Sequence, residues 1–100
     1  MILEHAEFHI HPGKQAEFEA AVKLGVETII SKTPGFIAYQ LQHSVEQPET
    51  YFLFIRWETL EAHVVGFRES PAFPAWRAVV GPFFASAPNV MHLREAHSTF

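Results

Sequence analysis

The sequence predicts a single α+β domain with the element order strand, helix, strand, strand, helix, strand. Three observations predict this class. Four segments carry the apolar patterns of strands, two others repeat their apolar residues with a helical period, and proline and glycine residues separate the segments. Because the chain has 100 residues, it has room for one hydrophobic core and for no second domain. We therefore expect residues 1–100 to form one domain.

The segment from Ile2 to Ile10 is expected to form the first strand, since apolar and polar side chains alternate along it with a period near two. A His-Pro-Gly sequence at 11–13 interrupts it. From Lys14 the apolar residues recur at helical spacing, which predicts a helix that runs to about Lys32. The Thr-Pro-Gly sequence at 33–35 ends this helix, because proline disfavours a helical residue before it and glycine permits a reversal of the chain.

Two β-rich segments, Phe36 to Val45 and Thr50 to Glu58, predict a hairpin of antiparallel strands around the polar residues 46–49. Tyr51 to Ile55 is apolar at every position. A strand of this kind must be covered on both faces, and the helices of so short a chain can cover only one of them. We therefore expect a second copy of the chain to cover the other face in a homodimer.

A second helical region is expected to begin at Thr59, a good N-cap, and to reach about Phe67. A Ser-Pro pair interrupts it, and a further helical segment runs from about Ala72 until Gly81 and the proline after it kink or end the helix. The last strand is predicted at Val90 to Leu93. This order is that of the ferredoxin-like split βαβ arrangement, a four-stranded antiparallel sheet with both helices on one face.

Composition and charge narrow the function classes. Seven basic and eleven acidic side chains give a net charge of -4, with no cluster of Lys and Arg, which argues against nucleic acid or an anionic membrane as the main partner. The absence of cysteine excludes a disulfide framework, a thiolate nucleophile and a Cys-ligated metal. The longest apolar runs are too short to span a membrane, and the start of the chain lacks the basic residues of a signal peptide. We expect a cytoplasmic protein that binds small neutral or aromatic molecules.

Several short motifs follow one another along nearly the whole chain. They are Pro12-Gly13, Glu17-Phe18, Pro34-Gly35-Phe36-Ile37-Ala38-Tyr39, Tyr51-Phe52-Leu53, Trp57-Glu58, Leu60-Glu61-Ala62-His63, and Ser70 with Phe73. In this order and spacing they resemble the antibiotic biosynthesis monooxygenase (ABM) domain. The resemblance implies a dimeric α+β barrel, in which two sheets pack face to face. It also implies, from the members of known activity, cofactor-free oxygenation of phenolic or quinol-type substrates in a pocket between sheet and helices.

The resemblance leaves other functions open, because the family includes heme-degrading oxygenases and an isomerase-like branch. The heme-degrading members share a catalytic Asn on the first strand, a Trp on the second helix and a His further along the chain. Here the first strand has no Asn, Gly66 and Phe67 stand near the place of the Trp, and Trp76 and Arg77 near that of the His. Heme degradation of that type is therefore disfavoured, and no cofactor is expected.

His63 is the expected catalytic residue. It shares a helical face with Leu60 and Phe67, which predicts that its side chain points toward the sheet. In an apolar pocket an imidazole stays neutral, and a neutral His can act as the general base for a phenol proton. The alternative is a His at the start of a helix that only bonds a backbone carbonyl.

Five aromatic residues are expected to bind the substrate: Tyr39, Trp57, Phe67, Phe73 and Trp76. Trp57 ends the third strand and could stack on a planar ligand, and the Tyr39 hydroxyl is a possible donor to a substrate oxygen. The aromatic residues of the second helical region occur at helical spacing. Each of the five could also serve only as core, or in the case of Tyr39 as a sheet-edge residue.

A metal site is a weaker alternative, and the favoured prediction is no metal. His5, Glu7, His9 and His11 share one face of the first strand, and the spacing of His9 and His11 suits two ligands of one metal, with Glu7 or His92 as a third. The same alternation of polar residues also describes a hydrated dimer interface.

The sequence thus favours a cofactor-independent monooxygenase that oxidises small electron-rich aromatic molecules of polyphenol or quinol type. The alternatives are a non-catalytic dimeric binder of small aromatic ligands, or an isomerase-like member of the same family. No Ser-His-Asp order, phosphate loop or paired-carboxylate spacing supports a hydrolase or a phosphoryl transferase.

Overall fold

The computed structural model describes all residues from Met1 to Phe100. The strands and α-helices are β1 (Ile2–His9), α1 (Gln15–Thr28), β2 (Phe36–His43), β3 (Thr50–Trp57), α2 (Ala72–Val80) and β4 (Asn89–Leu93). The α+β class and the order of the elements are therefore confirmed.

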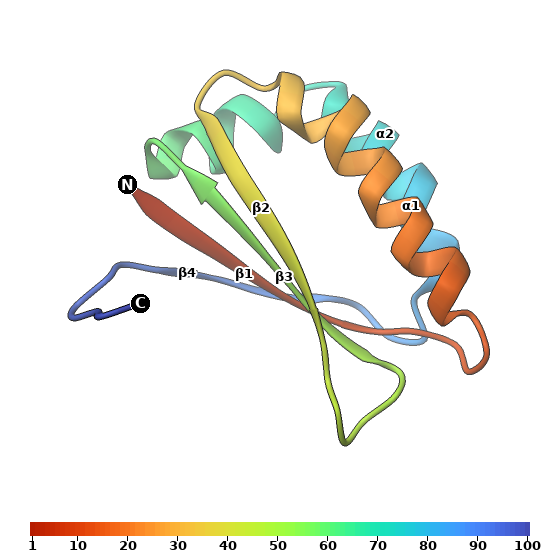
Figure 1. The fold of residues 1–100 in the computed structure, drawn as a ribbon. Coiled ribbons are helices and arrows are strands. Elements are labelled where there is room, and N and C mark those ends of the chain that lie inside the picture. Colours follow the sequence, from red (N-terminus) through yellow and green to blue (C-terminus); the bar gives the residue numbers. More distant parts are fainter.

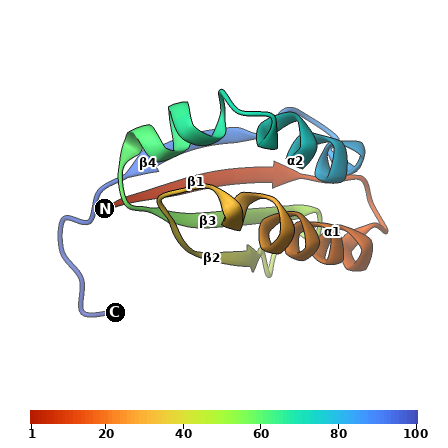
Figure 2. The same cartoon turned by 90° about the horizontal axis from the view of Figure 1, so that it is seen from above.

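The four strands form one antiparallel sheet in the order β2-β3-β1-β4, which places β1 and β3 at its centre. Both helices lie against the same face of the sheet, and the opposite face is open (Figures 1 and 2). This is the predicted ferredoxin-like arrangement. In the register of the sheet, Glu4 of β1 lies between Ile55 of β3 and His92 of β4.

The period of two in β1 separates the two faces. Glu4, Ala6 and Phe8 are buried beneath the helices, whereas His5 and Glu7 point to the open face and are only half-buried. The buried core combines this face of β1 with that of β3 and with the inner sides of the helices. Its members are Ala6, Phe8, Ile10, Phe18, Val22, Val26, Ile30, Tyr51, Leu53, Ile55, Trp57, Phe67, Trp76 and Val80.

The helical regions differ in detail from the prediction. The first helix ends at Thr28, and a separate 3-10 turn, η1 (Ile30–Lys32), completes the predicted span. The segment after β3 forms a π-helix, η2 (Ala62–Phe67), and its residues His63 and Phe67 are both buried. A second 3-10 turn, η3 (Gly81–Phe83), follows α2 at the predicted Gly-Pro position.

Two glycines allow close approaches that shape the region between sheet and helices. Gly35 has a φ of +95°, and a Cβ atom there would lie 2.6 Å from the Cβ of Ala62 in η2. Gly25 of α1 faces Trp76 of α2, where a Cβ atom would lie 2.7 Å from the indole ring. These positions let η2 approach the turn between η1 and β2 and let Trp76 of α2 pack against α1.

None of the helices combines the length and the apolar character needed to cross a lipid bilayer.

Candidate functional site

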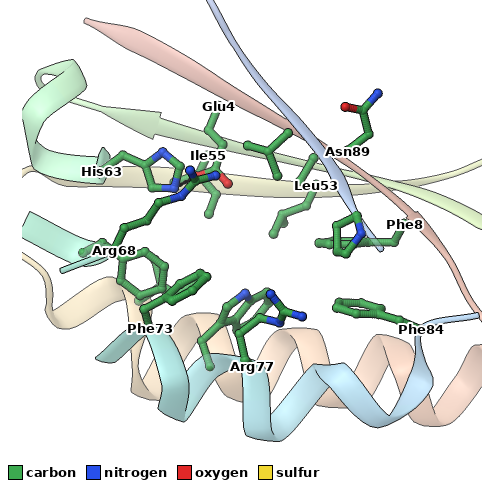
Figure 3. A pocket seen from close by; sticks show the side chains of 16 residues that line it. Glu4, Phe8, Leu53, Ile55, His63, Arg68, Phe73, Arg77, Phe84 and Asn89 are labelled. Atoms are coloured by element: carbon green, nitrogen blue, oxygen red, sulfur yellow. Dashed lines mark ion pairs between the residues drawn. The ribbon is translucent and has the colours of Figure 1, made fainter. Parts of the chain in front are cut away.

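A cavity of about 480 Å³ lies between the sheet and the helical layer. Its wall is made by β1, β3 and β4 on one side and by η2 and α2 on the other (Figure 3). Ten of the sixteen lining residues are hydrophobic. The polar ones are few: Glu4, His63, Arg68, Arg77 and Asn89. An apolar cavity with a small number of polar groups is typical of a site for a small molecule.

His63 lies on the wall of this cavity and is 2% exposed. Its ring packs nearly parallel to two aromatic rings, with centroid distances of 5.3 Å to Trp57 and 6.0 Å to Phe67, and these two rings also lie 6.1 Å from each other. The π-helix η2 supplies His63 and Phe67, and the end of β3 supplies Trp57. The side chain therefore points toward the sheet, as its helical spacing predicts.

Both nitrogens of His63 contact other polar side chains. Nδ1 lies 2.7 Å from Nε2 of His92, and Nε2 lies 3.3 Å from Oε1 of Glu4. The indole Nε1 of Trp57 donates a hydrogen bond of 3.0 Å to the same Glu4 oxygen. His92, His63 and Glu4 thus form a continuous chain of polar contacts beside the cavity, with His63 in the middle.

Burial sets the charges of this chain of contacts. It raises the pKa of Glu4 from 4.5 to about 7, although the Trp57 hydrogen bond and the positive charge of Arg68 oppose the change. Burial also lowers the pKa of His63 to about 4, with further lowering by Arg68 and His92. The pKa of His92 is lowered by burial and by Arg68 as well. At neutral pH both imidazoles are uncharged, and Glu4 exchanges readily between its neutral and ionised forms.

The second carboxylate oxygen of Glu4 is accessible. Glu4 lines the cavity, and its contacts with Trp57 and His63 both use Oε1. Oε2 of Glu4 makes no hydrogen bond within the chain, and the side chain keeps 9% of its surface exposed. This geometry allows Glu4 to exchange a proton with a bound molecule near neutral pH.

Two arginines complete the polar part of the wall. Arg68 and Arg77 line the cavity, and neither takes part in any of the ion pairs of the chain. The Cζ atom of Arg77 lies 5.9 Å from the ring centroid of Phe73 and 5.7 Å from that of Phe84. In Figure 3 the Arg68 side chain extends toward His63 and Glu4.

The structure brings most of the sequence-predicted site residues together. His63, Phe67, Phe73 and Trp76 all line the cavity. Trp57 lies behind His63 and holds Glu4 by its indole nitrogen, so it shapes the wall without forming part of it.

Tyr39 lies apart from the other predicted residues. Its hydroxyl donates a hydrogen bond of 3.3 Å to Glu27 of α1, and the residue is not part of the cavity wall. Burial and the Glu27 carboxylate raise the pKa of Tyr39. In this structure Tyr39 links β2 to α1.

The metal-ligand grouping considered for the first strand is wrong. His9 and Glu7 bond each other at 2.7 Å on the open face of the sheet, and the other nitrogen of His9 lies 3.2 Å from the hydroxyl of Thr50. His92 lies on the opposite face, where it contacts His63. No three His, Asp or Glu side chains of the chain converge in a way that suits a metal ion.

Sequence reasoning missed Glu4, Arg68, Arg77 and Asn89 as cavity residues, and it considered His92 only as a metal ligand. For Glu4 a signal was present. It is the charged residue of the strand face that also carries Ala6 and Phe8, so a buried carboxylate was to be expected there. For the arginines, the wide turn of η2 and the cation–π contacts of α2 determine their place, and neither has a sequence signature.

Comparisons with known proteins agree with this architecture. The profile of the antibiotic biosynthesis monooxygenase family (ABM) matches residues 1–79. The uncharacterized Bacillus subtilis protein YczJ is 37% identical over 95 residues, which make up 95% of this chain and 99% of YczJ. A crystal structure of a Bordetella bronchiseptica protein assigned to the antibiotic biosynthesis monooxygenases is 36% identical. It superimposes with a TM-score of 0.90 over 96% of this chain and 97% of its own.

A third similar protein has a ligand. The crystal structure of the monooxygenase ActVA-Orf6 of Streptomyces coelicolor, in complex with nanaomycin D, superimposes with a TM-score of 0.84 at 19% identity. The match covers 99% of this chain and 90% of that one. At this identity the likeness shows a common fold.

Proposed function

The chain belongs to the antibiotic biosynthesis monooxygenase family, and from that membership we propose that it is a cofactor-independent monooxygenase of small electron-rich aromatic molecules, of polyphenol or quinol type. The observation that carries the proposal is the uncharged His63, buried against Glu4 on the wall of an aromatic cavity. The nanaomycin D complex of ActVA-Orf6 supports it, because a monooxygenase of the same fold binds a small molecule.

Proton removal is the step that the residues of this chain promote. Glu4 and His63, which contact each other, accept the phenol proton of a bound substrate. Both residues line the cavity, where Oε2 of Glu4 and the edge of the imidazole face the substrate. Trp57 fixes the carboxylate, and His92 fixes the imidazole from the other side. At neutral pH the imidazole is uncharged and part of Glu4 is ionised, and these are the forms that can accept a proton in general base catalysis.

The resulting phenolate is electron-rich enough to reduce dioxygen without a cofactor. It transfers one electron to dioxygen, and the two radicals combine at a ring carbon to give a hydroperoxide. Loss of water then leaves a quinone carbonyl. One oxygen atom of dioxygen remains in the product and the other leaves as water, with the substrate supplying both hydrogens. The apolar wall excludes bulk water from these intermediates.

Oxygen uptake tests this proposal. With a panel of di- and trihydroxynaphthalenes, the protein should consume dioxygen faster than the buffer does, and His63→Ala should lower the rate by about 10²-fold or more, the usual contribution of a general base. His11→Ala, which removes an exposed imidazole outside the cavity, is the control and should keep the wild-type rate. Unchanged turnover in His63→Ala would remove His63 from the mechanism.

A non-catalytic role remains the second candidate, and a specific observation favours it: both nitrogens of His63 already have protein partners. In that case the cavity binds quinol-type molecules and releases them unchanged. A rise in melting temperature with such ligands, without oxygen uptake or product, would favour the binder. A rearranged product without oxygen uptake would favour the isomerase-like alternative.

We also propose that the functional unit is a homodimer formed through the open face of the sheet. Large apolar side chains gather on this face: Leu3, Phe52, Phe54, Met91 and Leu93. Met91 is 47% exposed and Leu93 38% exposed, and the ring of His5 packs between Phe52 and Phe54. Soluble monomers rarely expose a contiguous patch of this kind.

A further inference from the structure

Arg68 and Arg77 stand out among the polar residues of the cavity because neither guanidinium group has an acidic partner. The three ion pairs of the chain join other residues, so no carboxylate lies within 4.0 Å of either arginine. Both side chains line the cavity and are also exposed to solvent, and arginine keeps its charge at neutral pH. These two positive charges are therefore available to a ligand.

The charge of the cavity wall is opposite to that of the chain. The wall carries two arginines against one acidic residue, Glu4, whereas the whole chain has a net charge of -4. Burial keeps Glu4 partly protonated near neutral pH, which weakens its compensation of the arginines further. The cavity is thus a local positive site in an acidic protein, and an anion entering it gains favourable electrostatic interactions.

The surroundings of the arginines are aromatic. Arg77 lies over the rings of Phe73 and Phe84, which hold its planar group by cation–π contacts. Phe67, Phe73 and Trp76 continue the apolar wall toward His63. Figure 3 shows Arg77 on the helical side of the cavity, between Phe73 and Phe84, whereas the Arg68 side chain reaches toward His63 and Glu4. A planar ring would fit against the aromatic side chains with an acidic group turned toward the arginines.

We infer that Arg68 and Arg77 each offer a position for an anionic group, and that the molecules the cavity selects are aromatic compounds that carry a carboxylate or a similar anionic group. The guanidinium fork matches a carboxylate in two parallel hydrogen bonds, which gives both affinity and orientation. An acid held by Arg77 also orients the ring, because it leaves the opposite end of the molecule to face Glu4 and His63. This inference rests on the proposed function for the identity of the cavity as the substrate site.

Binding of an unreactive pair of probes tests the subsite separately from any oxygenation. Naphthalene-2-carboxylate and naphthalene-2-carboxamide have the same ring and nearly the same shape, and neither is oxidised by dioxygen. Isothermal titration calorimetry at pH 7.5 with wild-type protein should show that the carboxylate binds at least about tenfold more tightly than the amide, as expected for charge-assisted hydrogen bonds. Added salt should reduce this preference.

The variants Arg68→Gln and Arg77→Gln should each weaken carboxylate binding several-fold and leave amide binding unchanged, and the double variant should abolish the preference. Lys23→Gln removes a positive charge from the exposed side of α1 and should keep the wild-type preference. Equal affinities of the wild type for acid and amide, no binding of either probe at millimolar concentration, or an equal loss of both in the arginine variants would overturn the inference. Absence of oxygen uptake with quinols, together with a retained acid preference, would overturn only the proposed function.

Discussion

Glu4 is the only acidic side chain on the cavity wall. Its charge depends on the balance between burial, which raises its pKa, and the Trp57 hydrogen bond and the Arg68 charge, which lower it. Burial disfavours the carboxylate, whereas the indole N–H and the guanidinium favour it. The result is a carboxyl group that titrates close to neutral pH, beside an imidazole that stays uncharged. At the residue scale, this pairing is what distinguishes the cavity from an ordinary gap in a hydrophobic core.

The pH dependence of stability reports the state of Glu4. Its pKa is raised from 4.5 to about 7 on folding, so the folded chain keeps a proton that the unfolded chain releases in this range. Glu4 therefore makes the fold less stable as the pH rises from about 4.5 to about 7. Glu4→Gln removes this titration and still offers an oxygen to the Trp57 N–H. The variant should be more stable than wild type at pH 8, by on the order of 2–3 kcal/mol, with the difference vanishing toward pH 4.5.

Urea unfolding of both proteins at several pH values measures this difference. His63 acts in the opposite sense, because its lowered pKa makes the fold less stable as the pH falls from 6.5 to about 4. Comparing variant and wild type at the same pH largely removes that contribution. Glu58→Gln changes an exposed glutamate outside the cavity and serves as the control. A stability difference for Glu4→Gln that is independent of pH would contradict the account of Glu4.

At the scale of elements, the cavity exists because α2 and η2 lie over the sheet without filling the space above β1 and β4. The close packing of α1 against α2 fixes the position of α2. At this contact Gly25 leaves room for the ring of Trp76, which is a lining residue of the cavity. The shape of the site thus depends on a residue of α1 that does not touch it.

Gly25→Ala should therefore disturb the site from outside. The new Cβ atom would lie 2.7 Å from the indole of Trp76, so the ring or the helix must move. We expect a loss of about 1–3 kcal/mol in the free energy of unfolding, as for other overpacked cores, with a change in Trp fluorescence. Gly81→Ala is the control: nothing lies within 4 Å of its added Cβ and its φ is not positive, so stability should stay the same or rise slightly. Equal effects of the two substitutions would contradict the proposed contact.

The period of apolar residues in the sequence was enough to predict which faces of the elements meet. This period predicted that His63 points toward the sheet, and it distinguished the two faces of β1. The order of the elements and the motifs predicted the fold. The ferredoxin-like arrangement implies which strands are neighbours, but the register of their pairing and the position of η2 above them could not be obtained from the sequence, because both depend on contacts between distant segments. For this reason the meeting of Glu4, His63 and His92 was not predicted, and His92 was assigned to a metal grouping on the wrong face. Tyr39 faces the helices as its strand position suggests, but its Glu27 contact depends on the placement of α1.

At the scale of the whole molecule, the two faces of the sheet have different roles in this account. The helix-covered face holds the cavity, and the open face carries the apolar patch proposed to join two chains. A dimer built in this way leaves both cavities on the outer sides of the paired sheets. Each chain then keeps its own set of Glu4, His63 and the arginines.

Substitution of Phe54 tests the dimer. Phe54 lies near the centre of the open face, next to His5, and Phe54→Glu would place a charge in the apolar interface. Light scattering should give the wild type about twice the chain mass of 11.4 kDa, and Phe54→Glu should give a particle of one chain or an aggregate. Ala20→Glu adds the same charge to an exposed position of α1 and should remain dimeric. A wild-type particle of 11.4 kDa at micromolar concentration would refute the dimer.

Isotopically labelled dioxygen tests the central claim most directly. When the protein turns over a hydroxynaphthalene with a free ring position under heavy dioxygen, mass spectrometry should find one heavy oxygen atom in each quinone product and the other in water. The yield of labelled product should fall in His63→Ala and Glu4→Gln and should persist in His11→Ala. A quinone without label, or labelled product formed equally well in buffer alone, would contradict the assignment of this cavity to monooxygenation.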